Sequence, residues 1–193
     1  MKIRSVIALA AVMLGMSFMP GSVGAVHEGI CHSAIDSGNY NVIIGSGNIS
    51  GTSGNDVIIG SNGADSISAG SGDDIVCARG GSDYVDGGSG SDTLIGDIND
   101  GLEEIGPAGT AGSDTLSGGS GSDVLYGDAG NDILEGGSDT DRLIAGGGDD
   151  TLSGGSGNDT LNGDAPGASG TDSCDGGSGT DSQTNCESTN SIP

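Results

Sequence analysis

The chain has 193 residues, of which 42 are Gly, and only 2% are aromatic. Such a chain cannot build the core of an ordinary globular domain, and its composition alone is typical of disorder. Asp and Glu outnumber Lys and Arg by 28 to 4. The chain therefore lacks a basic surface that could neutralise phosphates, which argues against nucleic acids and anionic membranes as partners.

The first 25 residues have the composition of a secretory signal peptide. Lys2 and Arg4 open the segment, an apolar run covers residues 7–19, and small residues at 23–25 suit a cleavage site. This order is typical of exported proteins, and the apolar run is too short to cross a bilayer comfortably. We therefore predict a secreted, extracellular protein with no membrane anchor after cleavage of residues 1–25. An uncleaved anchor is the alternative.

Residues 26–50 lie between this segment and a series of repeats. The stretch VIIGSGNIS at 42–50 is similar to a repeat unit but has Gly47 where the later units have aspartate. We therefore expect residues 26–50 to form an N-terminal extension and a cap.

A nine-residue unit fills most of the remaining chain and is interrupted twice. Repeats with a short fixed period indicate a solenoid, in which each unit buries its apolar face against its neighbours. The chain after residue 50 divides into a first repeat block, an insertion loop, a second repeat block, a short loop with two terminal repeats, and a C-terminal tail, at 51–95, 96–108, 109–162, 163–184 and 185–193.

Each place in the unit has its own residue types. The fourth place is glycine in twelve of the thirteen units and Asp139 in the other, which suits a tight turn with positive φ. The last three places carry β-branched and aliphatic residues and predict a short strand, in which alternation points only the eighth side chain inward. These inward residues are Ile58, Ile67, Val76, Val85, Leu94, Leu116, Leu125, Leu134, Leu143, Leu152 and Leu161.

The sixth place is aspartate in all thirteen units. A turn, strand, turn, strand circuit needs two units, so unit i should stack on unit i+2. Asp56 would then lie over Asp74 and Asp92 along one edge, with Asp65 and Asp83 along the other. At a strand spacing of about 4.8 Å, two carboxylates repel by about 0.9 kcal/mol in water and by more inside a protein. One aliphatic side chain per unit buries too little surface to offset this repulsion and the loss of chain entropy, so the rows need a cation.

The available ligands indicate which cation it is. The repeats offer carboxylate and carbonyl oxygens but no histidine, whereas zinc and copper prefer nitrogen and sulfur ligands. Calcium accepts about six to eight oxygens in irregular arrangements, while magnesium demands a strict octahedron. We therefore predict that calcium is the cofactor and the direct partner of the chain.

The units match the pattern GGxGxDxUx, where U is a large aliphatic residue, and over Gly51 to Thr184 the chain resembles the RTX or haemolysin-type calcium-binding repeat family. The resemblance implies an all-β fold, a right-handed parallel β-roll with two repeats per coil. It also implies that sixth-place carboxylates and turn carbonyls hold calcium between successive turns. The chain looks like the small secreted bacterial members, without a toxin domain. By position, the ligand role falls to Asp56, Asp65, Asp74, Asp83, Asp92, Asp114, Asp123, Asp132, Asp141, Asp150, Asp159, Asp172 and Asp181.

Some units depart from this pattern. Asp139 replaces the fourth-place glycine of its unit and Arg79 occupies the turn of another, so we expect weaker sites there. The last two units carry Cys174 and Gln183 at the inward place, which we expect to end the apolar stack.

Four cysteines in an exported chain suggest two disulfide bonds. Three pairings are possible. We favour Cys31 with Cys77 and Cys174 with Cys186, because each bond then fastens one end of the solenoid. Free thiols are the alternative.

No other motif predicts a catalytic or metal site. His27 and His32 have the wrong spacing for a zinc protease helix, and residues 96–108 lack the glycine and glutamate places of an EF-hand loop, so we expect a surface loop there and no enzyme activity. The leading interpretation is a secreted calcium-binding protein that folds on binding the ion. The alternative is a structural or adhesive protein in which calcium is a scaffold ion and the outer face binds cell wall or matrix.

Overall fold

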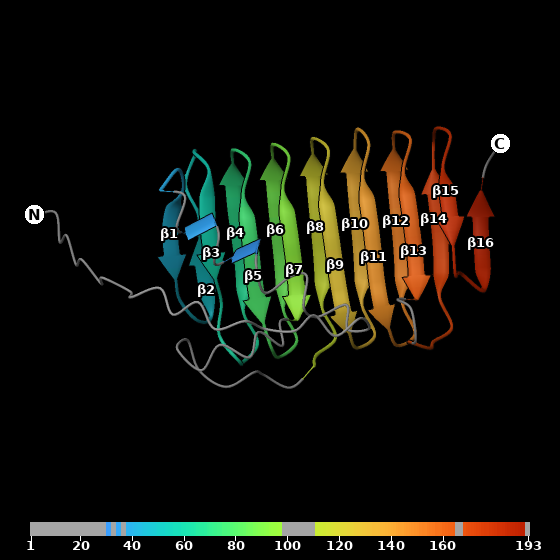
Figure 1. Ribbon diagram of the computed structural model, residues 1–193, viewed down its shortest axis with the longest axis horizontal. Coiled ribbons are helices and arrows are strands. Elements are labelled where there is room, and N and C mark those ends of the chain that lie inside the picture. Colours follow the sequence, from blue (N-terminus) through green and yellow to red (C-terminus); the bar gives the residue numbers. More distant parts are fainter. Residues whose placement is uncertain (1–29, 32–33, 36–37, 98–110, 165–167, 192–193) are drawn as a thin grey trace, which may run out of the picture.

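Short parallel strands in two facing sheets build a solenoid. The computed structural model describes residues 30–31, 34–35, 38–97, 111–164 and 168–191, and this part of the chain contains sixteen strands. Odd-numbered strands form sheet A and even-numbered strands form sheet B, and they follow one another in order along the solenoid (Figure 1). Residues 30–31 and 34–35 are helical, and within the described residues no helix has the length and apolar character needed to cross a membrane.

The strands are four to six residues long, or three where a sheet is ending. Sheet A contains β1 (Asn41–Ile44), β3 (Asp56–Ile59), β5 (Ile75–Arg79), β7 (Thr93–Asp97), β9 (Val124–Ala129), β11 (Arg142–Gly147), β13 (Thr160–Asp164) and β15 (Ser182–Thr184). Sheet B contains β2 (Asn48–Ser50), β4 (Ser66–Ser71), β6 (Tyr84–Ser89), β8 (Thr115–Ser120), β10 (Ile133–Ser138), β12 (Thr151–Ser156), β14 (Ser173–Gly177) and β16 (Ser188–Ser191).

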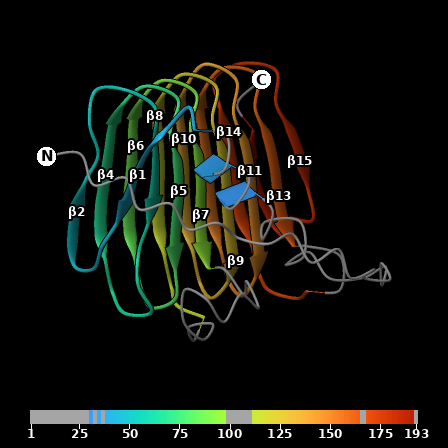
Figure 2. The ribbon, with the colours of Figure 1, turned by 60° about the vertical axis from the view of Figure 1, so that its left-hand side comes forward.

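One coil consists of one strand from each sheet and the two turns that join them (Figure 2). Equivalent residues in neighbouring coils are 18 residues apart, as for Asp65 and Asp83. The separation rises to 31 between Asp83 and Asp114 and to 22 between Asp150 and Asp172, where the repeats are interrupted. Strand pairing stays in register across both interruptions. The predicted parallel solenoid with two repeats per coil is therefore confirmed.

A single column of aliphatic side chains fills the space between the sheets. All the predicted inward residues are buried and form one cluster, which begins at Ile49 in the degenerate unit. The column also extends further than expected at its other end, because Cys174 is buried within it. First-place Ala69, Ala78 and Ala145 join the same cluster.

The outer face of sheet A corrects the expectation that only the eighth side chain is buried. Val57, Ile59, Cys77 and Ile95 are buried in clusters separate from the central column. The segment before the repeats covers them, so it forms a strap across β3, β5 and β7 as well as a cap. The repeat period could not reveal this contact, because the covering residues lie outside the repeats. They are Ile30, Cys31, Ala34, Ile35 and Tyr40.

Two disulfide bonds fasten the ends of the chain to the solenoid. Cys31 is joined to Cys77, which attaches the strap to β5, and Cys174 is joined to Cys186, which attaches the C-terminal segment to β14. No described cysteine is free. Of the three possible pairings, the structure contains the one favoured by the sequence analysis.

Candidate metal centres

The sixth-place aspartates stand at the two turns of each coil, directly before the strands. They form two rows that run along the solenoid, ladder 1 leading into sheet A and ladder 2 leading into sheet B. Ladder 1 contains Asp56, Asp74, Asp92, Asp123, Asp141, Asp159 and Asp181. Ladder 2 contains Asp65, Asp83, Asp114, Asp132, Asp150 and Asp172.

One oxygen of each carboxylate is held by the neighbouring coil. The main-chain N–H of one aspartate donates to Oδ1 of the aspartate one coil further along. In ladder 1, for example, the N–H of Asp123 lies 2.8 Å from Oδ1 of Asp141, and in ladder 2 the N–H of Asp114 lies 2.9 Å from Oδ1 of Asp132. The hydrogen bond fixes the orientation of each carboxylate and directs its other oxygen, Oδ2, to the same side of every turn.

In most ladder aspartates, this second oxygen is buried without a hydrogen-bond partner among the described residues. A buried carboxylate oxygen normally has a hydrogen-bond donor or a cation beside it, because its loss of water contacts is otherwise uncompensated. The unpartnered Oδ2 atoms belong to Asp74, Asp83, Asp92, Asp114, Asp123, Asp132, Asp141, Asp150, Asp159 and Asp172.

The first aspartate of each ladder differs from the rest. The main-chain N–H of Thr52 donates to Oδ2 of Asp56, and that of Ser61 donates to Oδ2 of Asp65, both at 2.6 Å. These two carboxylates therefore have partners for both oxygens. The nine-residue pattern treats all the units alike, so it could not separate these two aspartates from the others.

A main-chain carbonyl lies beside the unpartnered oxygens. A methyl group placed on Gly154 would lie 2.6 Å from Oδ2 of Asp159 and 2.7 Å from the carbonyl oxygen of Gly176. The same holds at Gly87, where the distances are 2.6 Å to Oδ2 of Asp92 and 2.8 Å to the carbonyl oxygen of Gly118. Carboxylate and carbonyl oxygens thus face a common point, and this is the donor set that hard cations prefer.

Within the described residues, no group of three or more His, Cys, Asp or Glu side chains is close enough to hold a metal ion. An ion bound in a ladder would therefore take most of its ligands from main-chain carbonyls and only one or two from carboxylates. His27 and His32 lie outside the described residues.

Burial makes the ladder carboxylates hard to ionise. It is the largest cause that raises the pKa of Asp92, Asp114, Asp132 and Asp141 to about 7. The hydrogen bond from the preceding aspartate lowers each pKa, and the charges of neighbouring ladder members raise it again. The fully ionised ladders therefore require a compensating positive charge near neutral pH.

Eight of the twelve fourth-place glycines adopt the positive φ that the repeat pattern predicts, whereas Gly54, Gly63, Gly112 and Gly170 do not. Fourth-place Gly121 and Gly148 have φ values of 120° and 134°, and Asp139 keeps this geometry with φ 78°. Arg79, at the second place of its unit, has φ 89°. The two departures thus preserve the turn, and their effect on local ion affinity stays a prediction.

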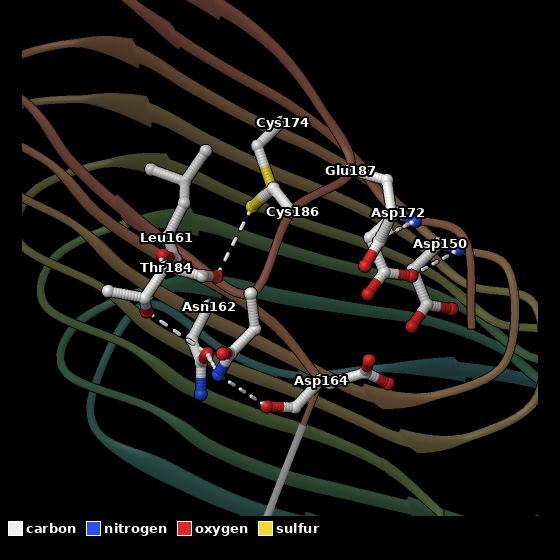
Figure 3. The surroundings of a disulfide bond; sticks show 10 residues. Asp150, Leu161, Asn162, Asp164, Asp172, Cys174, Thr184, Cys186 and Glu187 are labelled. Atoms are coloured by element: carbon white, nitrogen blue, oxygen red, sulfur yellow. Dashed lines mark hydrogen bonds between the residues drawn. A yellow bond between two sulfur atoms is a disulfide. The ribbon is translucent and has the colours of Figure 1, made fainter. Parts of the chain in front are cut away.

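Glu187 extends ladder 2 by one coil and was missed in the sequence analysis. The N–H of Asp172 donates to Oε2 of Glu187 at 2.6 Å, and Ser188 pairs with Ser173. Figure 3 shows Asp150, Asp172 and Glu187 following one another along the ladder. The sequence pattern predicts a tail at 185–193, because glutamate replaces aspartate and no GGxG sequence precedes it. The only sequence feature that could have identified this extension is an acidic residue, Glu187, directly before the short polar strand β16.

Comparison with known families agrees with this geometry. A family profile described as the RTX calcium-binding nonapeptide repeat (4 copies) matches residues 43–76, 50–85, 78–101, 108–143 and 135–165. Together these overlapping matches cover more than half of the chain. A search of curated proteins gives no significant match.

Proposed function

The chain belongs to the RTX calcium-binding nonapeptide repeat family, and from this membership we propose that it is an exported protein whose aspartate ladders bind several calcium ions and fold when the ions bind. The main observation that supports the proposal is the set of unpartnered Oδ2 atoms. They recur along both ladders and each is buried. A carbonyl oxygen faces the same point in the seven of these turns whose first place is glycine, those of Asp92, Asp114, Asp123, Asp132, Asp141, Asp159 and Asp172.

Calcium fits this donor set better than other common metals. All the ligands are oxygens, and the carbonyls come from turns whose spacing is set by the strands. Calcium tolerates irregular oxygen cages, whereas magnesium binds in a strict octahedron and gives up its water reluctantly. The sites would be held by the ladder aspartates from Asp74 and Asp83 onward, together with the first-place carbonyls of the next coil.

Ion binding and folding are coupled in this proposal. Without a cation, the folded state brings buried carboxylates together, and the unfolded chain separates them. Each bound ion then stabilises the folded state by mass action. Neighbouring sites share turns, so we expect cooperative binding. The affinity should be that of an extracellular module, with a dissociation constant on the order of 10⁻⁴ to 10⁻³ M.

Two features of the chain support export, and the proposed calcium binding is consistent with it. Residues 1–25 have the order of regions found in a signal peptide. Both disulfides are of the kind that persists in oxidising compartments, and an extracellular compartment also supplies calcium at a concentration that suits weak sites. N-terminal sequencing of protein recovered from the culture medium tests this part of the proposal, and we expect it to begin at Val26.

Circular dichroism tests the calcium proposal directly. The exported chain, with both disulfides formed, is titrated with calcium and separately with magnesium, and calcium is then removed with a chelator. We expect a sigmoidal transition from coil to β-structure that is specific to calcium and reversible. A spectrum that is β-rich in chelator, or coil at millimolar calcium, contradicts the proposal.

Substitution of one ladder pair tests the ligand assignment. Asp123→Ala with Asp141→Ala removes two adjacent carboxylates of ladder 1, and we expect a higher calcium midpoint and lower cooperativity. Asp86→Ala with Asp175→Ala is the matched control, because these half-buried aspartates lie in strands β6 and β14 and not in a ladder. Equal effects of the two double substitutions on the calcium midpoint would contradict the assignment of the ladder aspartates as calcium ligands.

A structural or adhesive role is a second candidate, favoured by the outer face of sheet B. Tyr84 and Ile133 are 50% and 45% exposed there, among serine, threonine and acidic side chains. We propose that a cell-wall or matrix component could bind this face while calcium serves as a scaffold ion, and we propose no catalytic role. Binding of the calcium-loaded chain to isolated cell walls, lost in Tyr84→Ser with Ile133→Ser, would support it.

A further inference from the structure

The second place of the unit distinguishes the two ladders. In ladder 1 this place is glycine in every turn after the first: Gly70, Gly88, Gly119, Gly137, Gly155 and Gly177. In ladder 2 the structure places an aspartate there in three turns, although residues 97 and 164 lie in the predicted interruptions. Asp97 pairs with second-place Arg79, and Asp128 and Asp164 pair with second-place Gly146. They belong to the turns of Asp114, Asp132 and Asp172. The nine-residue pattern assigns no role to these three carboxylates.

Asp97 lies inside its turn. Its side chain is 6% exposed, and its Oδ2 accepts a hydrogen bond from the main-chain N–H of Gly112 at 2.9 Å. Gly112 precedes Asp114 by two residues, so the carboxylate of Asp97 reaches across the turn toward the ladder. The residues between, 98–110, lie outside the described part of the chain.

Asp97 interacts electrostatically with carboxylates of ladder 2. Burial is the largest cause that raises the pKa of Asp97 to about 8, and the charges of Asp114, Asp132 and Asp128 raise it further. Asp128 likewise raises the pKa of both Asp114 and Asp132. The carboxylates of two successive coils therefore interact electrostatically at this edge.

The same arrangement recurs one turn before the end of the solenoid. The Oδ1 atom of Asp164 is buried without a hydrogen-bond partner among the described residues, as is Oδ2 of Asp172 in the same turn. The charge of Asp164 raises the pKa of both Asp150 and Asp172. Asp164 appears in Figure 3 below the ladder residues Asp150 and Asp172.

Two buried, unpartnered carboxylate oxygens in one turn point to a shared cation. We propose that Asp97, Asp128 and Asp164 each add a second carboxylate to the calcium site of its own turn, so that these turns of ladder 2 bind calcium more tightly than any turn of ladder 1. The inference rests on the calcium function proposed above. Because Asp97 and Asp164 stand directly before the two interruptions of the repeat, the ions there also tie together the two ends of each interruption.

The backbone at Asp128 is consistent with a role for its side chain. Asp128 has φ 74°, a left-handed conformation, whereas the equivalent residue of the next coil is Gly146 with φ 116°. Left-handed backbone is unfavourable for residues other than glycine. Glycine at this place would have less backbone strain than aspartate, so the backbone alone does not explain why the residue is aspartate.

Calcium titration calorimetry of the full exported chain tests the inference, with Asp164→Asn as the main variant. We expect two classes of site in the unmodified protein. A carboxylate next to a divalent ion should change its affinity by about tenfold, so Asp164→Asn should weaken one site of the tight class by that factor. Replacing all three aspartates with asparagine should leave a single weak class.

Asp149→Asn is the matched control. Asp149 is exposed, and its charge also raises the pKa of Asp150 and Asp172. Its Oδ1 accepts a hydrogen bond from the N–H of Thr171, as Oδ1 of Asn131 does from the N–H of Asp149, so asparagine can keep the contact. We expect less than a twofold change. Equal shifts in Asp149→Asn and Asp164→Asn would show a general effect of charge and overturn the inference.

Asp128→Gly separates ligand loss from misfolding. Glycine relieves the left-handed backbone, so a purely structural role predicts an unchanged or lower calcium midpoint in circular dichroism. A ligand role predicts a higher midpoint with the same final spectrum, and an unchanged or lower midpoint would overturn the inference. If the unmodified protein binds no calcium at all, the proposed function fails. If it binds calcium in one class that these variants leave unchanged, only this inference fails.

Discussion

In the absence of calcium, we expect the fold to be lost as the pH rises from about 5 to about 8. Burial raises the pKa of Asp92, Asp114, Asp132 and Asp141 from 3.8 to about 7. A pKa of about 7 in place of 3.8 corresponds to about 4 kcal/mol for one isolated group. Because neighbouring carboxylates share the same repulsion and water screens part of it, ionising all four in the ion-free fold opposes folding by on the order of 5 to 10 kcal/mol. That is comparable to the stability of a typical domain.

The direction of the effect follows from proton binding. Because the pKa values of the folded state exceed those of the unfolded chain, the folded state binds more protons between about pH 4 and pH 7. The stabilisation is complete below this window and is lost as the pH rises through about 7. Calcium replaces the protons at higher pH, so the calcium midpoint should rise as the pH falls.

Circular dichroism in chelator at several pH values, with and without calcium, checks this prediction. We expect β-structure at pH 5 in chelator, coil at pH 8, and β-structure again at pH 8 when calcium is added. A β-rich spectrum at pH 8 in chelator, or loss of structure when the sample is acidified from pH 8 to pH 5, would refute the role assigned to the ladder charges.

Three further predictions concern the core and the disulfides. Leu125→Ala removes part of a fully buried side chain and should lower the free energy of unfolding of the calcium-bound protein by about 3 kcal/mol, measured with denaturant. Ile133→Ala, at a 45% exposed site, should change it by less than about 1 kcal/mol. Equal losses would contradict the assigned core. Cys31→Ser with Cys77→Ser should release the strap and increase binding of a hydrophobic dye, while the calcium-induced transition persists; unchanged dye binding would mean that the strap stays in place without its bond. Trypsin cleavage after Arg79 and Arg142 should give the same fragments with and without reductant, because each disulfide lies within one fragment. Two fragments joined by a disulfide would contradict this connectivity.

The repeat period was sufficient to predict the architecture. In a solenoid each unit contacts only its neighbours, so a nine-residue period leads directly to an eighteen-residue coil and to rows of equivalent residues. The column from Ile58 to Leu161 and the two rows of aspartates were predictable for this reason, and both are present in the structure.

The sequence could not reveal what the non-repeating residues contact. Ile30 and Cys31 give no periodic signal, and their burial against Cys77 and Ile95 depends on where the chain passes before the repeats begin. Glu187 was overlooked for a similar reason, because its unit lacks the glycines that mark a turn. Its place in ladder 2 follows from the pairing of β14 with β16.

The sequence by itself determined the period, the inward residue, the acidic rows and the oxygen-only donor set, because each is a local property that the repeat copies from coil to coil. Only the tertiary structure decided how the carboxylate oxygens are used. Oδ1 is held by the neighbouring coil. Oδ2 is buried without a partner among the described residues in ten of the thirteen aspartates, whereas Thr52 and Ser61 donate to it in Asp56 and Asp65. That division depends on the direction of main-chain N–H groups across stacked turns, which no residue pattern specifies.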